Sequence, residues 1–232
     1  MKRQVKLFDP VIDDNELRAL ERILKGKSWA DGSGSKQVRK FEEEFQKETN
    51  SDSSIAVNSG TAALYLALSM ENIQNKEVIL PSMSFVSTAH AIIANKAKPR
   101  FADIDLDTLC IDPEEIEESL SKSTEIILPV HFGGLPSDLK KIEKICHRNH
   151  LTLIEDAAHA AGASYDGKKI GSHGKFVCFS FHPVKNLAMP TGGLISINDK
   201  NYKHISEKLR AKRWCGITDR MKTKYDVKEL GW

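Results

Sequence analysis

The apolar positions of this 232-residue chain alternate, from about residue 54 onward, between short continuous runs and longer stretches with helical spacing. The short runs are typical of strands that are buried on both faces. In the longer stretch 137–150, the residues Leu139, Ile142 and Ile145 would fall on one face of a helix. Strands that alternate with such helices predict an α/β domain, with a mostly parallel sheet flanked by helices in three layers.

The predicted elements follow one another in a regular order. The expected strands are residues 54–58, 77–81, 98–104, 125–132, 151–156, 176–181 and 192–197. The expected helices between and after them are residues 60–70, 84–95, 112–120, 137–150 and 199–214. The third of these helices has favourable start signals, because Asp112 can cap it and Pro113 suits the first helical position.

Two more helices are expected ahead of this core, at residues 13–26 and 35–48. We therefore divide the chain into an N-terminal helical segment, residues 1–50, that packs on a large domain, residues 51–232. The loop between the two helices is rich in glycine and contains Trp29. This aromatic side chain could line a substrate site or merely anchor the loop.

Composition and charge exclude several classes of function. The chain is 40% hydrophobic and 28% charged with a net charge of +2, so no bulk electrostatic attraction to nucleic acid or an acidic membrane is expected. The four cysteines lie more than thirty residues apart, which favours reduced thiols over a zinc site or disulfide framework. No apolar run approaches the roughly 20 residues that cross a bilayer. We expect a cytoplasmic protein.

Candidate chemistry is sought after the strands, because ligands of open parallel sheets bind outside the carboxyl ends of the strands. Residues Asn58, Ser59, Gly60 and Thr61 follow the first strand and open a helix, whose N-terminal N–H groups suit a phosphate. The same residues would also make an ordinary capped turn. The chain contains neither GxGxxG nor GxxxxGK[ST], so a dinucleotide fingerprint and a P-loop are not supported.

Carboxylates end the strand 151–156. Glu155 and Asp156 could bind a metal, act as a base, pair with a cationic ring nitrogen or cap a helix. His159 follows three residues later and could share a helical face with Asp156. No third ligand at metal spacing accompanies them, so a zinc site is weakly supported.

Three other residues follow strands at positions where chemistry is expected. Phe85 could stack on a flat cofactor or pack in the core, and His131 is more typical of a hydrogen-bonded interior histidine. Lys185 lies in "SFHPVKN", directly after the apolar run "FVCFSF". Taken alone, this lysine is explained by a solvent-facing turn, because lysine is rarely buried.

Together these residues fit one cofactor better than separate structural roles. Pyridoxal phosphate needs a lysine for covalent attachment, a carboxylate for its pyridinium nitrogen, a phosphate cradle and packing for its ring. The phosphate-suited helix start, Phe85, Asp156 and Lys185 would each follow a different strand. The sequence therefore predicts a pyridoxal 5'-phosphate site and no resident metal.

Several segments resemble the DegT/StrS-type sugar aminotransferases, which have the fold type I of pyridoxal-phosphate enzymes. The resemblance runs in order from about Leu7 to the end of the chain and is most specific around residues 154–193. The segments that carry it are "NSGTAALYLAL", "EVILPSMSFVSTAHAI", "PVHFGG" and "IEDAAHAAGASYDGKKIGSHGKFVCFSFHPVKN", followed by a pair of glycines.

The resemblance implies roles for individual residues. Lys185 matches the lysine that binds the cofactor and later moves the proton, and Asp156 matches the partner of the pyridine nitrogen. His159 stands where the family has Gln or His near the ring and its phenolic oxygen, and Phe85 matches the stacking aromatic. The matches to the phosphate contacts are Gly60, Thr61 and Ser180.

The resemblance also implies a reaction and its partners. An amino acid, typically glutamate, would leave its amine on the cofactor, and a nucleotide-linked keto-sugar would take it up. Such enzymes of polysaccharide biosynthesis are homodimers with their sites at the subunit interface. Lys185 argues against the related dehydratases, which have histidine there, and the absent glycine fingerprint disfavours a nicotinamide dehydrogenase.

The chain departs from the family's pattern in two places. Thr191 precedes the paired glycines where many relatives have an acidic residue, which changes the local polarity. The sequence ends at Trp232, before the family's Asn-aromatic motif and small C-terminal domain. We therefore expect the large domain of a longer enzyme, and the alternative is a catalytically inactive cofactor-binding relative with a regulatory or vestigial role.

Overall fold

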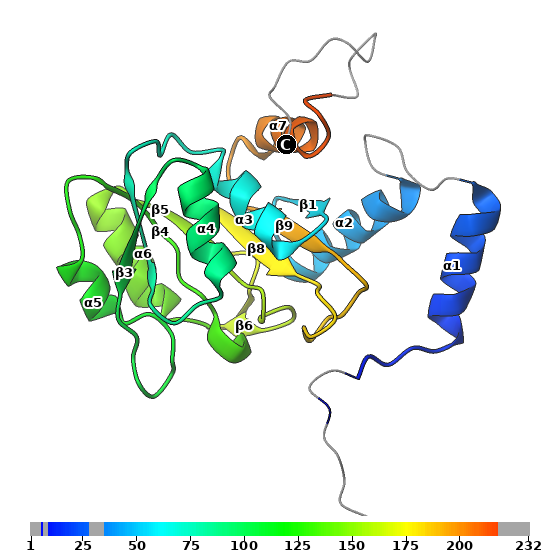
Figure 1. Ribbon diagram of the computed structural model, residues 1–232, viewed down its shortest axis with the longest axis horizontal. Coiled ribbons are helices and arrows are strands. Elements are labelled where there is room, and N and C mark those ends of the chain that lie inside the picture. Colours follow the sequence, from blue (N-terminus) through cyan, green and yellow to red (C-terminus); the bar gives the residue numbers. More distant parts are fainter. Residues whose placement is uncertain (1–5, 7–8, 28–34, 218–232) are drawn as a thin grey trace, which may run out of the picture.

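The structure, a computed structural model, describes residues 6, 9–27 and 35–217 and centres on a twisted sheet (Figure 1). The seven strands lie in the order β1-β9-β8-β5-β4-β2-β3. Strands β3, β2, β4, β5 and β8 pair in parallel, whereas β9 is antiparallel to both β8 and β1. The strands are β1 (Ser53–Val57), β2 (Glu77–Pro81), β3 (Lys98–Ala102), β4 (Thr124–Ile127), β5 (Thr152–Asp156), β8 (Phe176–Ser180) and β9 (Gly193–Ile197).

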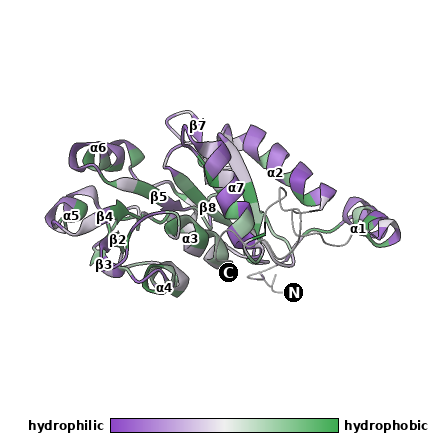
Figure 2. Cartoon of the chain, turned by 90° about the horizontal axis from the view of Figure 1, so that it is seen from above, coloured by the Kyte–Doolittle hydropathy of each residue, from purple (hydrophilic) through white to green (hydrophobic). Residues whose placement is uncertain are grey.

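Helices cover both faces of this sheet, which confirms the predicted three-layer α/β/α architecture (Figure 2). One buried apolar cluster joins one face to α3, α4 and α7, and a second cluster joins the other face to α2, α5 and α6. The helices are α1 (Asp14–Gly26), α2 (Lys36–Thr49), α3 (Gly60–Leu68), α4 (Val86–Ala94), α5 (Pro113–Glu118), α6 (Leu139–Asn149) and α7 (Tyr202–Arg213).

The helices differ in how much of their surface they bury. Helix α3 is apolar nearly all round, and six of its nine residues are buried because the sheet, α4 and α7 enclose it. Helix α1 has strong local signals, including a capping box between Asp13 and Glu16, yet none of its residues is buried. It projects beside the sheet domain in Figures 1 and 2. Helix α5 begins as predicted, with Asp112 capping and Pro113 in its first turn.

Residues 157–163 form turns, so the predicted helical face shared by Asp156 and His159 is wrong. The alanine-rich sequence favours a helix locally, but Gly162 has a φ of +84° and the chain then enters a hairpin. That hairpin pairs β6 (Ser164–Tyr165) with β7 (Lys168–Lys169) around Asp166 and Gly167, both with positive φ. An Asp-Gly pair is a strong signal for such a turn, but strands of only two residues are too short to show a pattern of alternating side chains in the sequence.

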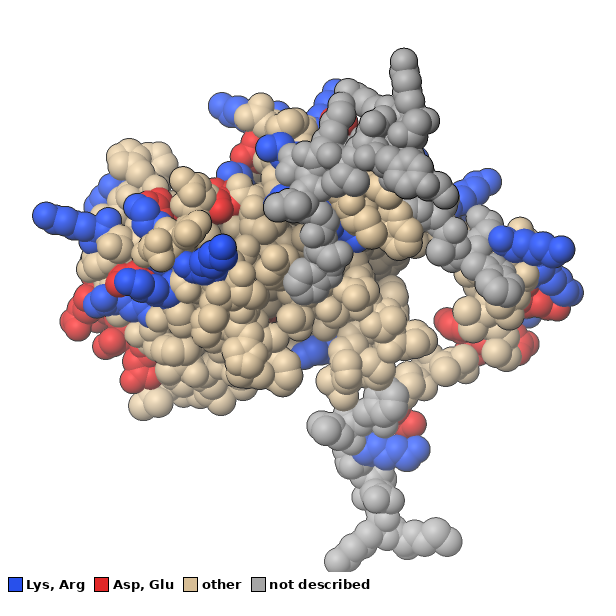
Figure 3. Space-filling model, turned by 45° about the horizontal axis from the view of Figure 1, so that its top comes forward, with Lys and Arg blue, Asp and Glu red and all other residues tan. Residues whose placement is uncertain are grey.

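Surface charge is mixed on the face drawn in Figure 3, where basic and acidic residues lie interspersed. No helix in the described ranges combines the length and apolar character that a membrane span requires.

Candidate active site

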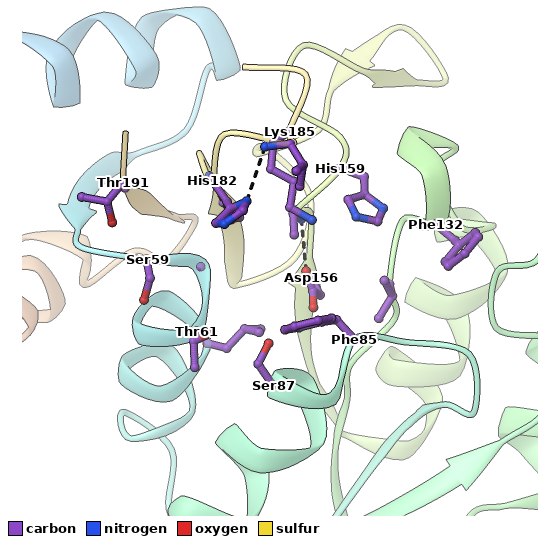
Figure 4. Close-up of a pocket in the computed structure, with 17 residues that line it drawn as sticks. Ser59, Thr61, Phe85, Ser87, Phe132, Asp156, His159, His182, Lys185 and Thr191 are labelled. Carbon is purple, nitrogen blue, oxygen red and sulfur yellow. Dashed lines mark hydrogen bonds between the residues drawn. The ribbon is translucent and has the colours of Figure 1, made fainter. Parts of the chain in front are cut away.

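A cavity of about 270 Å³ lies where the parallel strands end, at the edge that the strand pattern predicts. Its walls come from the β1–α3 turn, the start of α4, the ends of β4, β5 and β8, and the segment before β9. The residues to which the family resemblance gives roles all line it, as Figure 4 shows for those that are labelled. They are Gly60, Thr61, Phe85, Asp156, His159, Ser180 and Lys185.

The N-terminus of α3 forms one end of the cavity. Ser59 caps the helix by accepting a hydrogen bond from the N–H of Ala62 at 3.1 Å, and the helix start carries positive dipole. Gly60 lies so close to β8 that a Cβ atom there would be 2.7 Å from the Cβ of Ser180. The helix N-terminus and the Ser180 hydroxyl therefore face the same small volume, which suits an anion.

The start of β9 and the residues just before it lie against this helix start. A Cβ atom at Gly193 would collide with the backbone of Ser59 and Gly60, so only glycine fits there. Thr191 lines the cavity, and its hydroxyl donates to the carbonyl oxygen of Asn58 at 2.7 Å. The threonine that departs from the family's pattern therefore ties two walls of the cavity together.

Asp156 forms the floor of the cavity and is 4% exposed. Its Oδ2 accepts a hydrogen bond from the Thr88 hydroxyl at 2.8 Å, and its Oδ1 accepts one from the N–H of Ala158 at 3.1 Å. A carboxylate has about four lone-pair sites, so two protein donors leave capacity for a further donor in the cavity.

Glu155 turns away from the cavity, because successive side chains of a strand point to opposite faces. Its Oε2 lies 2.7 Å from Nε2 of His131, and its Oε1 accepts from the N–H of Gly174. The N–H of Ser137 donates to Nδ1 of His131, so the ring proton lies on Nε2 and points at Glu155. Glu155 and His131, which we call the scaffold pair, are fully buried and outside the reactive cavity. His131 is thus the hydrogen-bonded interior histidine that its sequence context favours.

Lys185 lies in a turn, yet it is half-buried and lines the cavity (Figure 4). Its backbone N–H donates to the carbonyl oxygen of His182 at 2.8 Å, which closes the turn that presents the side chain. Burial lowers the pKa of the Lys185 amine below its usual value, and the Asp156 carboxylate partly offsets this effect. More of the amine is therefore neutral, and hence nucleophilic, than in an exposed lysine.

His159 is held by the loop that follows β4. The N–H of Gly133 donates to its Nδ1 at 3.2 Å, and the ring of Phe132 packs edge-on at 6.1 Å between centroids. Burial first, and the positive charge of Lys185 second, lower the pKa of His159, whereas Asp156 raises it. The ring is thus biased toward the neutral form with its proton on Nε2, a hydrogen-bond donor.

Phe85 lies at the mouth of the cavity, just before α4, and is 72% exposed. A large aromatic side chain at this exposure lacks the packing of a core residue, so the core interpretation of Phe85 is wrong. Phe132 and His182 also line the cavity and Thr88 lies beneath it, although no sequence pattern marks these three residues as functional. Trp29 lies outside the described residues. Within those residues, no group of three or more His, Cys, Asp and Glu gathers around a possible metal position.

The sequence of residues 10–232 matches the DegT/DnrJ/EryC1/StrS aminotransferase family. The chain belongs to this family. Aminotransferases of the DegT/StrS family depend on pyridoxal phosphate.

Relatives of known sequence or structure cover nearly the whole of this chain. An uncharacterized protein of Methanocaldococcus jannaschii is 40% identical over 212 residues, which make up 91% of this chain and 53% of that protein. The crystal structure of 3-amino-5-hydroxybenzoic acid synthase is 32% identical with a TM-score of 0.89, covering 97% of this chain and 58% of that one. DesI, solved in the presence of its TDP-sugar product, is 32% identical with a TM-score of 0.80, and the match covers 89% of this chain and 51% of the DesI chain. The chain thus spans about half the length of the curated relative it matches.

Proposed function

We propose that the chain is the pyridoxal-phosphate-binding part of an aminotransferase that moves an amino group from an amino acid, glutamate, to a nucleotide-linked keto-sugar. The observation that carries the proposal is the convergence of Lys185, Asp156, Phe85 and the α3 N-terminus on one cavity. Membership of the DegT/DnrJ/EryC1/StrS family supports the reaction class. The 32% identity to DesI, which has a TDP-sugar product, supports the substrate class.

The residues present fit the cofactor. Asp156 is a buried carboxylate with unused lone pairs toward the cavity, as a protonated ring nitrogen requires. The amine of Lys185 is positioned to bind an aldehyde carbon covalently, and Phe85 offers a ring face at the mouth. The phosphate would lie among the N-terminus of α3, Gly60, Thr61 and Ser180, where Gly60 and Gly193 permit close backbone approach.

The chain's own residues supply positioning and proton transfer. When bound, pyridoxal phosphate supplies an electron sink for a carbanion at the substrate carbon. The amine of Lys185 would take a proton from that carbon and return it at another position, and its lowered pKa leaves more of the amine in the neutral form that can accept a proton. The Asp156 carboxylate stabilises positive charge at the ring nitrogen. His159 offers its Nε2 proton to an oxygen acceptor in the cavity.

The proposal extends to the organisation of the protein. Residues 1–50 would be a helical segment accompanying the large domain of residues 51–232. The active unit would be a homodimer in the cytoplasm, as the family resemblance implies, with the amino donor and the nucleotide-sugar as small-molecule partners.

The proposal is tested by loading the purified protein with pyridoxal phosphate and recording its visible absorption. We expect a band that borohydride removes, with the label fixed at Lys185, and loss of the band in Lys185→Ala. Lys144→Ala is the matched control, because Lys144 is exposed on α6 and does not line the cavity. A well-folded protein without the band would overturn the cofactor assignment.

The same loaded protein separates an enzyme from an inactive relative. Adding glutamate should convert the bound cofactor to its amine form, and a nucleotide-linked keto-sugar should reverse that change. A stable band that does not respond to any amino donor would overturn the aminotransferase proposal and leave a cofactor-binding protein.

A further inference from the structure

We propose that Thr88 is a positioning residue of this site, which orients the carboxylate of Asp156 toward the ring nitrogen of the cofactor. The inference rests on the proposed function, and it concerns a residue that does not itself line the cavity. Thr88 lies in the first turn of α4, behind Asp156.

The contact between the two side chains is buried and short. The Thr88 hydroxyl donates to Oδ2 of Asp156 at 2.8 Å, and the residues are 0% and 4% exposed. Hydrogen bonds to an ionised acceptor are stronger than those between neutral groups, and burial strengthens them further. The hydroxyl therefore holds one carboxylate oxygen while the N–H of Ala158 holds the other.

These two donors determine which way the carboxylate faces. The last torsion of an aspartate side chain is broad, so packing alone does not choose its angle. Thr88 holds Oδ2 and the N–H of Ala158 holds Oδ1. These two hydrogen bonds fix the plane of the carboxylate, and its remaining lone pairs face the cavity. Without the hydroxyl, one of these two restraints is lost.

The position of Thr88 in its helix supports this assignment. A threonine in the middle of a helix commonly bonds its hydroxyl to a carbonyl oxygen of the preceding turn, but Thr88 lies in the first turn of α4, where no helical turn precedes it. Here the hydroxyl donates instead to a residue 68 positions away in the sequence. Phe85 lies three residues before Thr88, so the start of α4 contributes both the aromatic ring at the mouth and the donor beneath the floor.

A matched pair of substitutions tests the hydroxyl. Thr88→Val replaces the hydroxyl by a methyl group of similar shape, and Thr88→Ser retains the hydroxyl. We expect the valine variant to bind pyridoxal phosphate about tenfold or more weakly, the loss typical of a hydrogen bond to a charged group. The pH midpoint of the visible band should also shift in the valine variant, and the serine variant should restore both properties.

A control and a double variant separate positioning from general destabilisation. Thr124→Val removes another buried threonine hydroxyl, which accepts from the N–H of Ser121 at 3.0 Å and lies at the start of β4, away from the cavity. It should leave cofactor affinity and band midpoint unchanged. In an Asp156→Asn background, Thr88→Val should cause little further loss of affinity, because Asp156→Asn already removes the charged carboxylate that the Thr88 hydroxyl is proposed to orient.

The outcomes distinguish this inference from the proposed function. A wild-type band together with unchanged affinity and midpoint in Thr88→Val would overturn the role of Thr88 and leave the proposed function intact. Absence of the band in folded wild-type protein would overturn the proposed function itself. If Thr88→Val does not fold, Thr88→Ala replaces it as the variant without a hydroxyl, and the serine variant must still behave as wild type.

Discussion

The last two residues of β5 carry carboxylates that the strand turns to opposite sides of the sheet. Glu155 faces the side of α6 and is bound by His131 and the N–H of Gly174. Asp156 faces the cavity and the side of α4, where Thr88 contacts it. Both residues are buried, at 0% and 4% exposure, so depth alone does not distinguish them.

The difference lies in their donors. Both donors to Glu155 can only donate. The His131 ring has its proton on Nε2, and the backbone N–H of Gly174 cannot become an acceptor. Asp156 has a backbone donor and a hydroxyl, and a hydroxyl can donate or accept. The scaffold pair therefore ties the ends of β4 and β5 to the chain before β8, whereas Asp156 is left able to bind a ligand.

The largest expected contrast is in stability between Glu155→Gln and Asp156→Asn. A glutamine at position 155 has one acceptor oxygen, but His131 and the N–H of Gly174 both donate there. One buried donor is therefore left unsatisfied, at a cost of about 1–3 kcal/mol. At Asp156, the amide group can donate to a reversed Thr88 hydroxyl, so we expect less than about 1 kcal/mol. Denaturant unfolding of the cofactor-free proteins measures both, and equal losses would remove the distinction.

A second contrast concerns the pKa of His159. The Asp156 carboxylate raises it, so Asp156→Asn should lower it further in cofactor-free protein, while Glu155→Gln should not change it. NMR titration of the histidine ring measures this directly. An increase or no change in Asp156→Asn would contradict the arrangement of the cavity.

The same pKa has a consequence for stability at acid pH. The folded protein holds the His159 proton less readily than the unfolded chain, whose usual pKa is 6.5. As the pH falls below 6.5, the unfolded state takes up the proton first, so the free energy of unfolding decreases until the folded pKa is passed. This loss should be larger in Asp156→Asn than in wild type, as thermal unfolding at pH 5 and 7 would show.

The smallest expected effect on stability is at Phe85, which lines the same cavity as Asp156 but is exposed. Because Phe85 is 72% exposed, Phe85→Ala should change the free energy of unfolding by less than about 0.5 kcal/mol. The affinity of the Phe85→Ala variant for pyridoxal phosphate should fall severalfold, because the contact between the Phe85 ring and the cofactor ring is lost. Phe101→Ala is the control, since Phe101 is 53% exposed on β3, away from the cavity, and should leave affinity unchanged.

Much of the fold could be predicted because each strand and helix is indicated by the apolar run or helical spacing of its own residues. The order of strands and helices was correct, as was the cap of α5 by Asp112. The error at residues 157–163 has a tertiary cause. The chain there must bring His159 to the cavity and then enter the β6–β7 hairpin, and these requirements override the helical preference of its alanines.

The lining of the cavity was predictable where residues follow strands, and less so where a residue contacts the lining from behind. Lys185, Asp156 and the start of α3 could be named because the carboxyl ends of parallel strands converge. Thr88 could not, because a threonine in an apolar helix carries no sign of a partner 68 positions away. The residue pattern alone likewise left Glu155 and Asp156 as equal candidates, and only the family resemblance pointed to Asp156.

The sequence by itself determined the alternation of strands and helices, the α/β class and the set of groups suited to a phosphate, a ring and a covalent bond. Those properties follow from residue type and short-range spacing. The tertiary structure decided which carboxylate faces the cavity, which ring nitrogen of His159 remains available and which hydroxyl contacts Asp156. These depend on contacts between distant segments, since a side chain's role is set by the donors and acceptors that folding brings beside it.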